Sequence, residues 1–143
     1  MVVVDGQGLP LGNHLHSASP SEVKLVEATL ATIRVGRRNR AGRPRQKLPR
    51  LIGDRGYDSD PLRKQLAARG TELIAPHRKN RRKPPTQDGR GLRRYKRRWI
   101  VERTFAWIGN FRRLVVRYDR SLTIYKAFFH IACFMIVLRR VLK

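Results

Sequence analysis

Two acidic side chains stand where a carboxylate could do chemistry. Asp54 directly follows an apolar segment at 51–52 that reads as a short strand, and the ligands of α/β sheets bind at the carboxyl ends of strands. Glu102 lies in a strongly basic stretch, with Arg98 four residues before it. A lone carboxylate in that setting is either a salt-bridge partner or a metal ligand held next to a polyanion.

Each acid also has an ordinary structural explanation. Asp54 opens a plausible turn, D-R-G-Y, and Asp58 or Asp60 could equally cap the helix that follows. Glu102 could form an intrahelical ion pair with Arg98, which would contribute only about 0.2–0.5 kcal/mol. Together, however, the acids indicate a metal site, because two or three carboxylates that hold divalent metals promote in-line displacement at phosphorus. Oxygen ligands favour Mg²⁺ or Mn²⁺, with Asp54 and Glu102 as the ligands.

The composition favours a polyanionic partner. The 143 residues include 33 Lys and Arg against 10 Asp and Glu, a net charge of +23. Nucleic acid is the expected partner, because neutralisation of phosphates by Lys and Arg dominates that kind of affinity; a membrane surface is the second option. The 41% of hydrophobic residues allow a core. The single cysteine, Cys133, excludes an internal disulfide and a cysteine-built zinc site, and is expected in the core.

The stretch from 90 to 113 must position Glu102, and its spacing predicts a helix. One face would carry Tyr95, Trp99, Glu102 and Ala106. An adjoining apolar stripe of Val101, Phe105 and Ile108 should pack on a core. Trp99 and Trp107 are expected to be packing residues rather than platforms for base stacking.

The first half of the chain predicts a hairpin and a helix. Strands at 2–4 and 9–16 should flank a turn at 5–8. A helix from Glu22 to about Val35 should end at Gly36. Two basic loops, at 36–50 and 76–92, are either solvated connectors or phosphate contacts.

Asp54 should lie within a strand–helix–strand unit. Its strands cover 51–52 and 72–75, on either side of a helix that starts at Ser59 or Asp60 and ends at Gly70. Such strands are expected to be parallel and adjacent, so the pattern predicts an α/β layer with the hairpin as an antiparallel edge. A last helix at 122–142 contains the apolar run 127–138, which is too short to span a bilayer and should be buried.

These motifs resemble DDE transposases of bacterial insertion sequences. Tyr95, Arg98 and Glu102 match the Y-x2-R-x3-E part of that family's signature. The segments RWIVERTFAWI around Glu102, FRRL-x-x-RY at 111–118, GDRGYDS at 53–59 and the opening VVVDGQGLPLG also look like the family. The resemblance covers essentially the whole chain. It implies an RNase H-like fold and Mg²⁺- or Mn²⁺-dependent DNA cleavage and strand transfer at transposon ends.

The resemblance assigns roles to individual residues. Asp54 matches the second acid of the family's catalytic triad and Glu102 the third. Tyr95 and Arg98 match residues that contact DNA, and neighbouring arginines would hold phosphates. Those arginines are Arg94, Arg97, Arg112 and Arg113. The signature continues with a lysine whose position is Gly109 here, so that contact is either lost or taken over by Arg112 or Arg113.

The family's first Asp belongs to a strand upstream of the hairpin, and Asp5 is a poor substitute because it lies in the hairpin turn. The chain is therefore expected to be a single, partial domain at 1–143, a truncated RNase H-like fold that is catalytically deficient alone. An upstream transposase segment, supplied through a frameshift, would complete it, or it is a decayed remnant. The alternatives are a non-catalytic basic nucleic-acid-binding protein and a trans-acting inhibitor of full-length transposase. The expected partners are DNA at transposon ends and targets, in the cytoplasm and nucleoid, without a membrane.

Overall fold

The computed structural model describes residues 1–16, 21–36 and 47–142, and shows four short strands in two separate pairs. Strands β1 (Val2–Val4) and β2 (Pro10–Asn13) form an antiparallel hairpin. Strands β3 (Arg50–Ile52) and β4 (Glu72–Ile74) are parallel, with Leu51 opposite Leu73. The predicted hairpin and the predicted strand–helix–strand unit are both confirmed.

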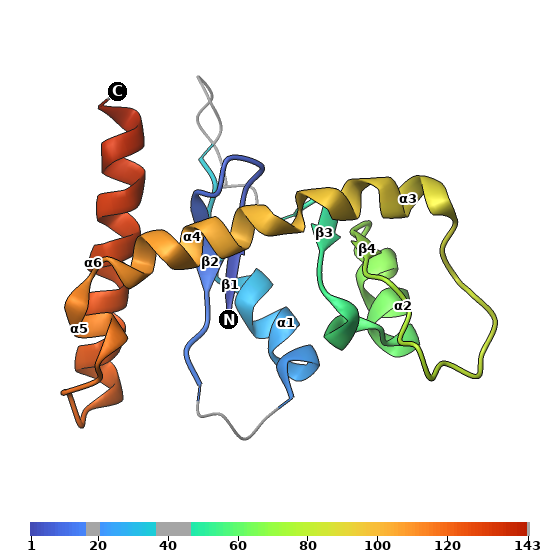
Figure 1. Cartoon of the computed structure of the whole chain (residues 1–143), viewed down its shortest axis with the longest axis horizontal. Coiled ribbons are helices and arrows are strands. Elements are labelled where there is room, and N and C mark those ends of the chain that lie inside the picture. The colour runs from blue at the N-terminus through green and yellow to red at the C-terminus, as the bar shows by residue number, and fades with distance from the viewer. Residues whose placement is uncertain (17–20, 37–46, 143) are drawn as a thin grey trace.

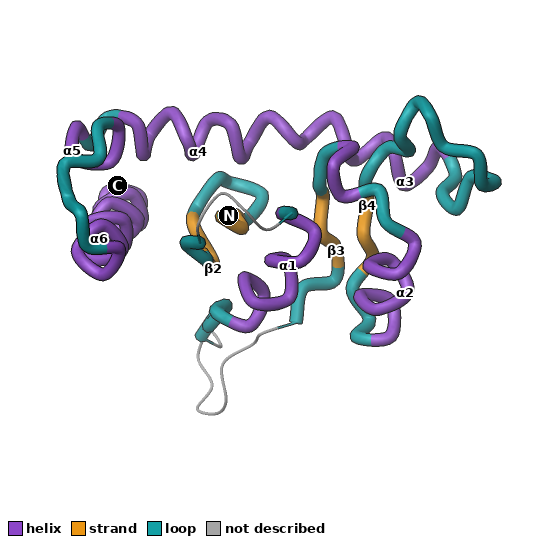
Figure 2. The backbone as a smooth tube through the Cα atoms, turned by 90° about the horizontal axis from the view of Figure 1, so that it is seen from below, coloured by secondary structure: helices purple, strands orange, loops and turns teal. Residues whose placement is uncertain are grey.

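Helices account for most of the remaining described chain (Figure 1). They are α1 (Glu22–Ala31), α2 (Asp60–Ala68), α3 (Gly89–Arg93), α4 (Trp99–Gly109), α5 (Arg112–Val115) and α6 (Leu122–Val141). Two 3₁₀ segments join them, η1 (Arg55–Tyr57) and η2 (Arg94–Arg98). Segments α3, η2 and α4 follow one another without a break and run along one side of both strand pairs, while α1 and α2 lie on the opposite side (Figure 2).

The prediction of one α/β layer with an antiparallel edge is wrong for the described residues. Strand β1 is hydrogen-bonded to β2 alone, and β3 to β4 alone, within the parts of the chain that the structure describes. The two pairs instead face each other across a groove lined by residues of β1 and β3. The architecture is therefore a mixed α/β arrangement with two small sheets.

Two helix boundaries also differ from the predictions. Helix α1 ends at Ala31 because the Thr32 hydroxyl donates to the carbonyl O of Thr29 (2.7 Å) and accepts the backbone N–H of Asn13 (3.1 Å). The helix expected at 90–113 ends at Gly109 and is interrupted before α5. Most of the predicted basic loop at 36–50 lies outside the described residues.

The core consists of two apolar clusters. One joins α1, α2 and β4 through Val26, Leu62, Leu66, Leu73 and Ala75. The other joins α4 and α6 through Ile108, Phe129, Cys133 and Ile136. The core position expected for Cys133 is confirmed.

Helix α4 reaches the core through a stripe that differs in part from the one predicted. Its buried residues are Ile100, Thr104 and Ile108, whereas Phe105 is 50% exposed. The burial of Ile108 is confirmed, but Ile100 and Thr104 are buried where Val101 and Phe105 were expected, and Thr104 also binds the hairpin turn.

That turn is attached to α4 by side-chain hydrogen bonds. The Thr104 hydroxyl donates to the carbonyl O of Gly8 at 2.7 Å, and Arg103 Nη2 donates to that of Gln7 at 2.7 Å. Gly8 has φ of 86°, and a Cβ there would lie 3.0 Å from the Thr104 hydroxyl. The position therefore requires glycine, both for its backbone conformation and for the close approach of α4.

Helix α6 is less buried than predicted. Phe129, Ala132, Cys133 and Ile136 face the rest of the protein, but Leu122, Ile124, Ile131 and Phe134 are exposed. The helix has 20 residues, and the mean hydropathy is 1.6 over 18 of them, so it is long and apolar enough to cross a membrane by length and composition. Core helices of soluble proteins meet the same criterion. The expected burial of this helix is therefore found on one face only, because the other face has no partner among the described residues.

Candidate active site

The two predicted acids line one groove. A cavity of about 520 Å³ lies between β1 and β3 and is bounded by η2 and α4. Asp54 lines it from the end of β3, and Glu102 from the first turn of α4. Arg97 and Arg98 line the same groove. The fold thus brings together acids that are far apart in sequence.

Asp54 both caps a turn and lines the groove, two roles that the sequence left as alternatives. Its carboxylate caps η1, with Oδ1 accepting the backbone N–H of Gly56 at 2.7 Å. Within the described residues, Oδ2 has no hydrogen-bond partner, and the residue is exposed. One carboxylate oxygen is therefore fixed by the turn while the other remains available to a ligand.

Glu102 forms the ordinary ion pair with Arg98. Arg98 Nη2 lies 2.5 Å from Glu102 Oε1, and the Arg98 guanidinium also lies over the Tyr95 ring, 5.9 Å from its centroid. The three residues of the Y-x2-R-x3-E pattern are thus in contact as one row on the helical run. Any cation that Glu102 binds has to compete with Arg98.

Replacing Arg98 with alanine should change the free energy of unfolding by less than about 0.5 kcal/mol, because exposed pairs at this helical spacing contribute little. The two side chains are 37% and 55% exposed. Urea denaturation of Arg98→Ala beside the unmodified chain measures this. A loss of several kcal/mol would show that the row is a structural element of the fold instead.

The donor chemistry of the groove fits a divalent metal, but the number of ligands does not. Carboxylate oxygens suit Mg²⁺ or Mn²⁺. However, no three His, Cys, Asp or Glu side chains of the described residues lie close enough to hold a metal together. Asp5 lines the groove, yet its Oδ1 accepts the backbone N–H groups of Gln7 (2.8 Å) and Leu9 (2.9 Å). Asp5 is therefore a hairpin-turn residue, as expected.

The predicted DNA-contacting arginines lie in two places. Arg94 and Arg97 are exposed on η2, and Arg97 lines the groove. Arg112 and Arg113 are exposed on α5, where the Arg113 guanidinium lies 4.4 Å from the centre of the Phe128 ring. The α5 arginines line no part of the groove, so the structure does not bring all four together.

The tryptophans enclose a cation. The Arg103 guanidinium lies 5.0 Å from the centre of the Trp99 ring and 4.9 Å from that of Trp107. Trp107 packs on the α4–α6 cluster, as predicted, but Trp99 is 52% exposed. The arrangement orients Arg103 towards the hairpin turn.

A buried carboxylate at the end of η1, Asp58, was not singled out as a site residue by the sequence. The Asp58 side chain is 2% exposed and accepts hydrogen bonds from Arg63 Nη2 (3.0 Å), His77 Nδ1 (2.9 Å) and the backbone N–H of Arg78 (2.8 Å). Burial alone would raise the pKa of Asp58, but these hydrogen bonds outweigh burial and lower it to about 2. The motif gave only a weak signal for Asp58, as a possible cap, because its partners follow at irregular spacings.

Comparison with known proteins gives a consistent result. The family described as transposase DDE domain matches residues 1–138. The chain is 38% identical over 136 residues to a protein of Burkholderia cepacia named as transposase for insertion sequence element IS402; the match covers 94% of this chain and 60% of that protein. It is 36% identical over 91 residues to one of Brucella ovis named as transposase for IS6501, covering 62% of this chain and 67% of that protein.

The chain thus spans about three fifths of the length of the first of these relatives. No solved structure matches it.

Proposed function

Because this chain belongs to the family of transposase DDE domains, we propose that it takes part in DNA transposition, through metal-dependent strand cleavage and strand transfer at insertion-sequence ends. The single observation that carries this proposal is the groove shared by Asp54 and Glu102. These two residues would hold Mg²⁺ or Mn²⁺. When bound, the metal would activate the attacking hydroxyl and stabilise the leaving oxygen.

Arg98 and Tyr95 would position the DNA. In the structure the Arg98 guanidinium is paired with Glu102. Once Glu102 binds a cation, the Arg98 fork becomes free for a phosphate, whose geometry it matches. Arg94 and Arg97 extend this positive surface on η2. Loading of the acids and binding of DNA would therefore support each other.

A third carboxylate would come from an extended segment that fills the groove. Within the described residues, β1 and β3 each have one edge without a strand partner, and both line the groove. Unpaired edges are ready templates for an added strand. Such a strand would join the two pairs into one RNase H-like sheet and bring its acid beside Asp54 and Glu102. An upstream transposase segment or a full-length transposase would supply this strand.

Calorimetric titration with Mn²⁺ tests the metal role. The unmodified chain should bind Mn²⁺ weakly, because two carboxylates hold it, and binding should disappear in Asp54→Asn/Glu102→Gln. The control is Glu72→Gln, which removes an exposed acid that pairs with Arg50 and does not itself line the groove; it should bind as the unmodified chain does.

Two outcomes would contradict the metal role. If the unmodified chain binds no Mn²⁺, two alternative functions remain. The chain would be a basic nucleic-acid-binding protein, or a cytoplasmic inhibitor of a full-length transposase. Equal binding by the double variant would place the cation elsewhere.

A further inference from the structure

The turn that presents Asp54 is held by one arginine of the loop after β4. Arg78 Nε donates to the carbonyl O of Arg55 at 3.3 Å, and Nη2 donates to that of Gly56 at 2.9 Å. The peptide group that joins Arg55 to Gly56 accepts Arg78 at its oxygen and donates its N–H to Asp54 Oδ1 at 2.7 Å. A single peptide group therefore connects the Arg78 guanidinium to the Asp54 carboxylate.

Arg78 is itself anchored through Asp58. Its backbone N–H donates to Asp58 Oδ2 at 2.8 Å, and Asp58 is the buried carboxylate that also binds Arg63 and His77. Arg63 Nη2 donates in addition to the carbonyl O of Ala75 at 2.7 Å. Arg63 thus links Asp58 to the residue that follows β4. The hydrogen bonds from Arg63, His77 and Arg78 fix the Asp58 carboxylate in one orientation. Arg78 is fixed at its backbone while its side chain holds the turn.

We propose that Arg78 is a positioning residue for Asp54. By fixing the Arg55–Gly56 peptide group it holds Asp54 Oδ1 in the turn and leaves Oδ2 available for a cation. Hydrogen bonds in series polarise one another, so the guanidinium strengthens the bond to Asp54. Removal of a residue that orients a metal ligand commonly lowers the affinity for the metal by about tenfold to hundredfold. This inference rests on the metal role proposed for Asp54.

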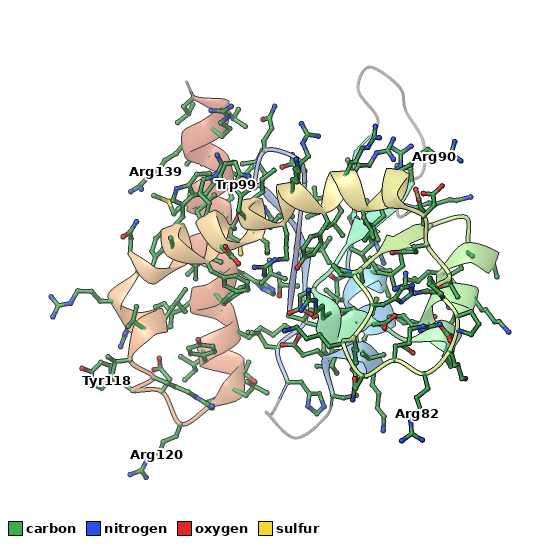
Figure 3. The ribbon with its side chains drawn as sticks, turned by 45° about the vertical axis from the view of Figure 1, so that its right-hand side comes forward. Arg82, Arg90, Trp99, Tyr118, Arg120 and Arg139 are labelled. Carbon is green, nitrogen blue, oxygen red and sulfur yellow. The ribbon has the colours of Figure 1, made fainter. Side chains whose placement is uncertain are left out.

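The Gly56 amide proton reports the arrangement without any metal. Arg78→Gln should move its NMR resonance upfield, in the same direction as Asp54→Ala, because the hydrogen bond to Oδ1 weakens. Arg78 is exposed, so its replacement opens no core cavity. The matched control is Arg82→Gln, which removes the same charge from the same loop; Figure 3 shows the Arg82 side chain pointing away from the ribbon. This control should leave the Gly56 resonance in place.

Mn²⁺ affinity gives the second readout. Arg78→Gln should lower it about tenfold or more, Arg78→Lys should restore part of the loss because lysine keeps the charge without the fork, and Arg82→Gln should stay within about twofold. The inference is overturned if Arg78→Gln matches Arg82→Gln in both measurements. If the unmodified chain binds no Mn²⁺, the metal role fails and with it the positioning of a metal ligand, while the Gly56 resonance still decides whether Arg78 holds the turn.

Discussion

Glu102→Gln should lower strand transfer at least about 10³-fold when this chain is assayed together with the segment that supplies the third carboxylate. Removal of a carboxylate charge from a two-metal site forfeits several kcal/mol of transition-state stabilisation, and each 1.36 kcal/mol corresponds to a tenfold change in rate. Glutamine keeps the length and an oxygen of the side chain. The measurement is the rate of product formation on DNA that carries insertion-sequence ends.

The fold should be intact in this variant, which separates chemistry from stability. Glu102 is about half exposed, and its pair with Arg98 contributes little to stability. The control is Glu72→Gln, which removes an exposed acid of β4 that pairs with Arg50 and does not line the groove; it should retain the unmodified rate. Strand transfer by Glu102→Gln within tenfold of that rate would show that Glu102 is not a catalytic ligand.

Asp58→Asn should destabilise the chain by about 2–4 kcal/mol at pH 7. The asparagine cannot match the charge-assisted bonds from Arg63 and His77, and it leaves the buried side of Arg63 without its counter-charge. Denaturation in urea at neutral pH measures the loss. Glu72→Gln, again the exposed control, should cost less than about 0.5 kcal/mol.

The free energies of unfolding of the unmodified chain and of Asp58→Asn should become equal at acid pH. The pKa of Asp58 is about 2 in the folded chain, below its value of about 3.9 in an unfolded one. A depressed pKa stabilises the fold above the unfolded value, and this stabilisation is lost as the pH falls from about 4 to 2. The difference between the unmodified chain and Asp58→Asn should therefore be full at pH 6 and shrink below pH 4. A difference that is independent of pH would mean that the Asp58 charge is not the cause.

Local pattern predicted the elements better than their assembly. The β-branched run at 2–4, the in-phase spacing of Leu9 and Leu11 and the Asp5-Gly6 turn were sufficient for the hairpin. The strand–helix–strand unit followed from helix start and stop signals such as Ser59 and Gly70. The end of α1 was missed because it depends on Thr32 binding the N–H of Asn13, a contact between distant segments. The separation of β1–β2 from β3–β4 was missed, because strand order depends on which edges meet in space.

The residues of the candidate site were predictable from the sequence, but the contacts that hold them were not. Residue type and spacing identified Asp54, Glu102 and the Arg98 pair, all of which line the groove. The hold on the Asp54 turn was not predictable, since Arg78 follows Gly56 by 22 residues and acts through backbone carbonyls. Backbone acceptors are present at every residue and leave no mark in a sequence.

The hydrogen bond between the Thr104 hydroxyl and the Gly8 carbonyl spans 96 residues, and this spacing sets the order of folding during synthesis. The hairpin turn leaves the ribosome before α4, and Thr104 follows Gly8 by 96 residues, which takes about 5–20 s at ordinary elongation rates. An isolated two-stranded hairpin is only marginally stable in water. The end of α1 emerges sooner and can hold β2 through the contact between Thr32 and Asn13. The hairpin turn, however, stays without its α4 partner until that helix has emerged, so this part of the fold should form late, with the docking of α4.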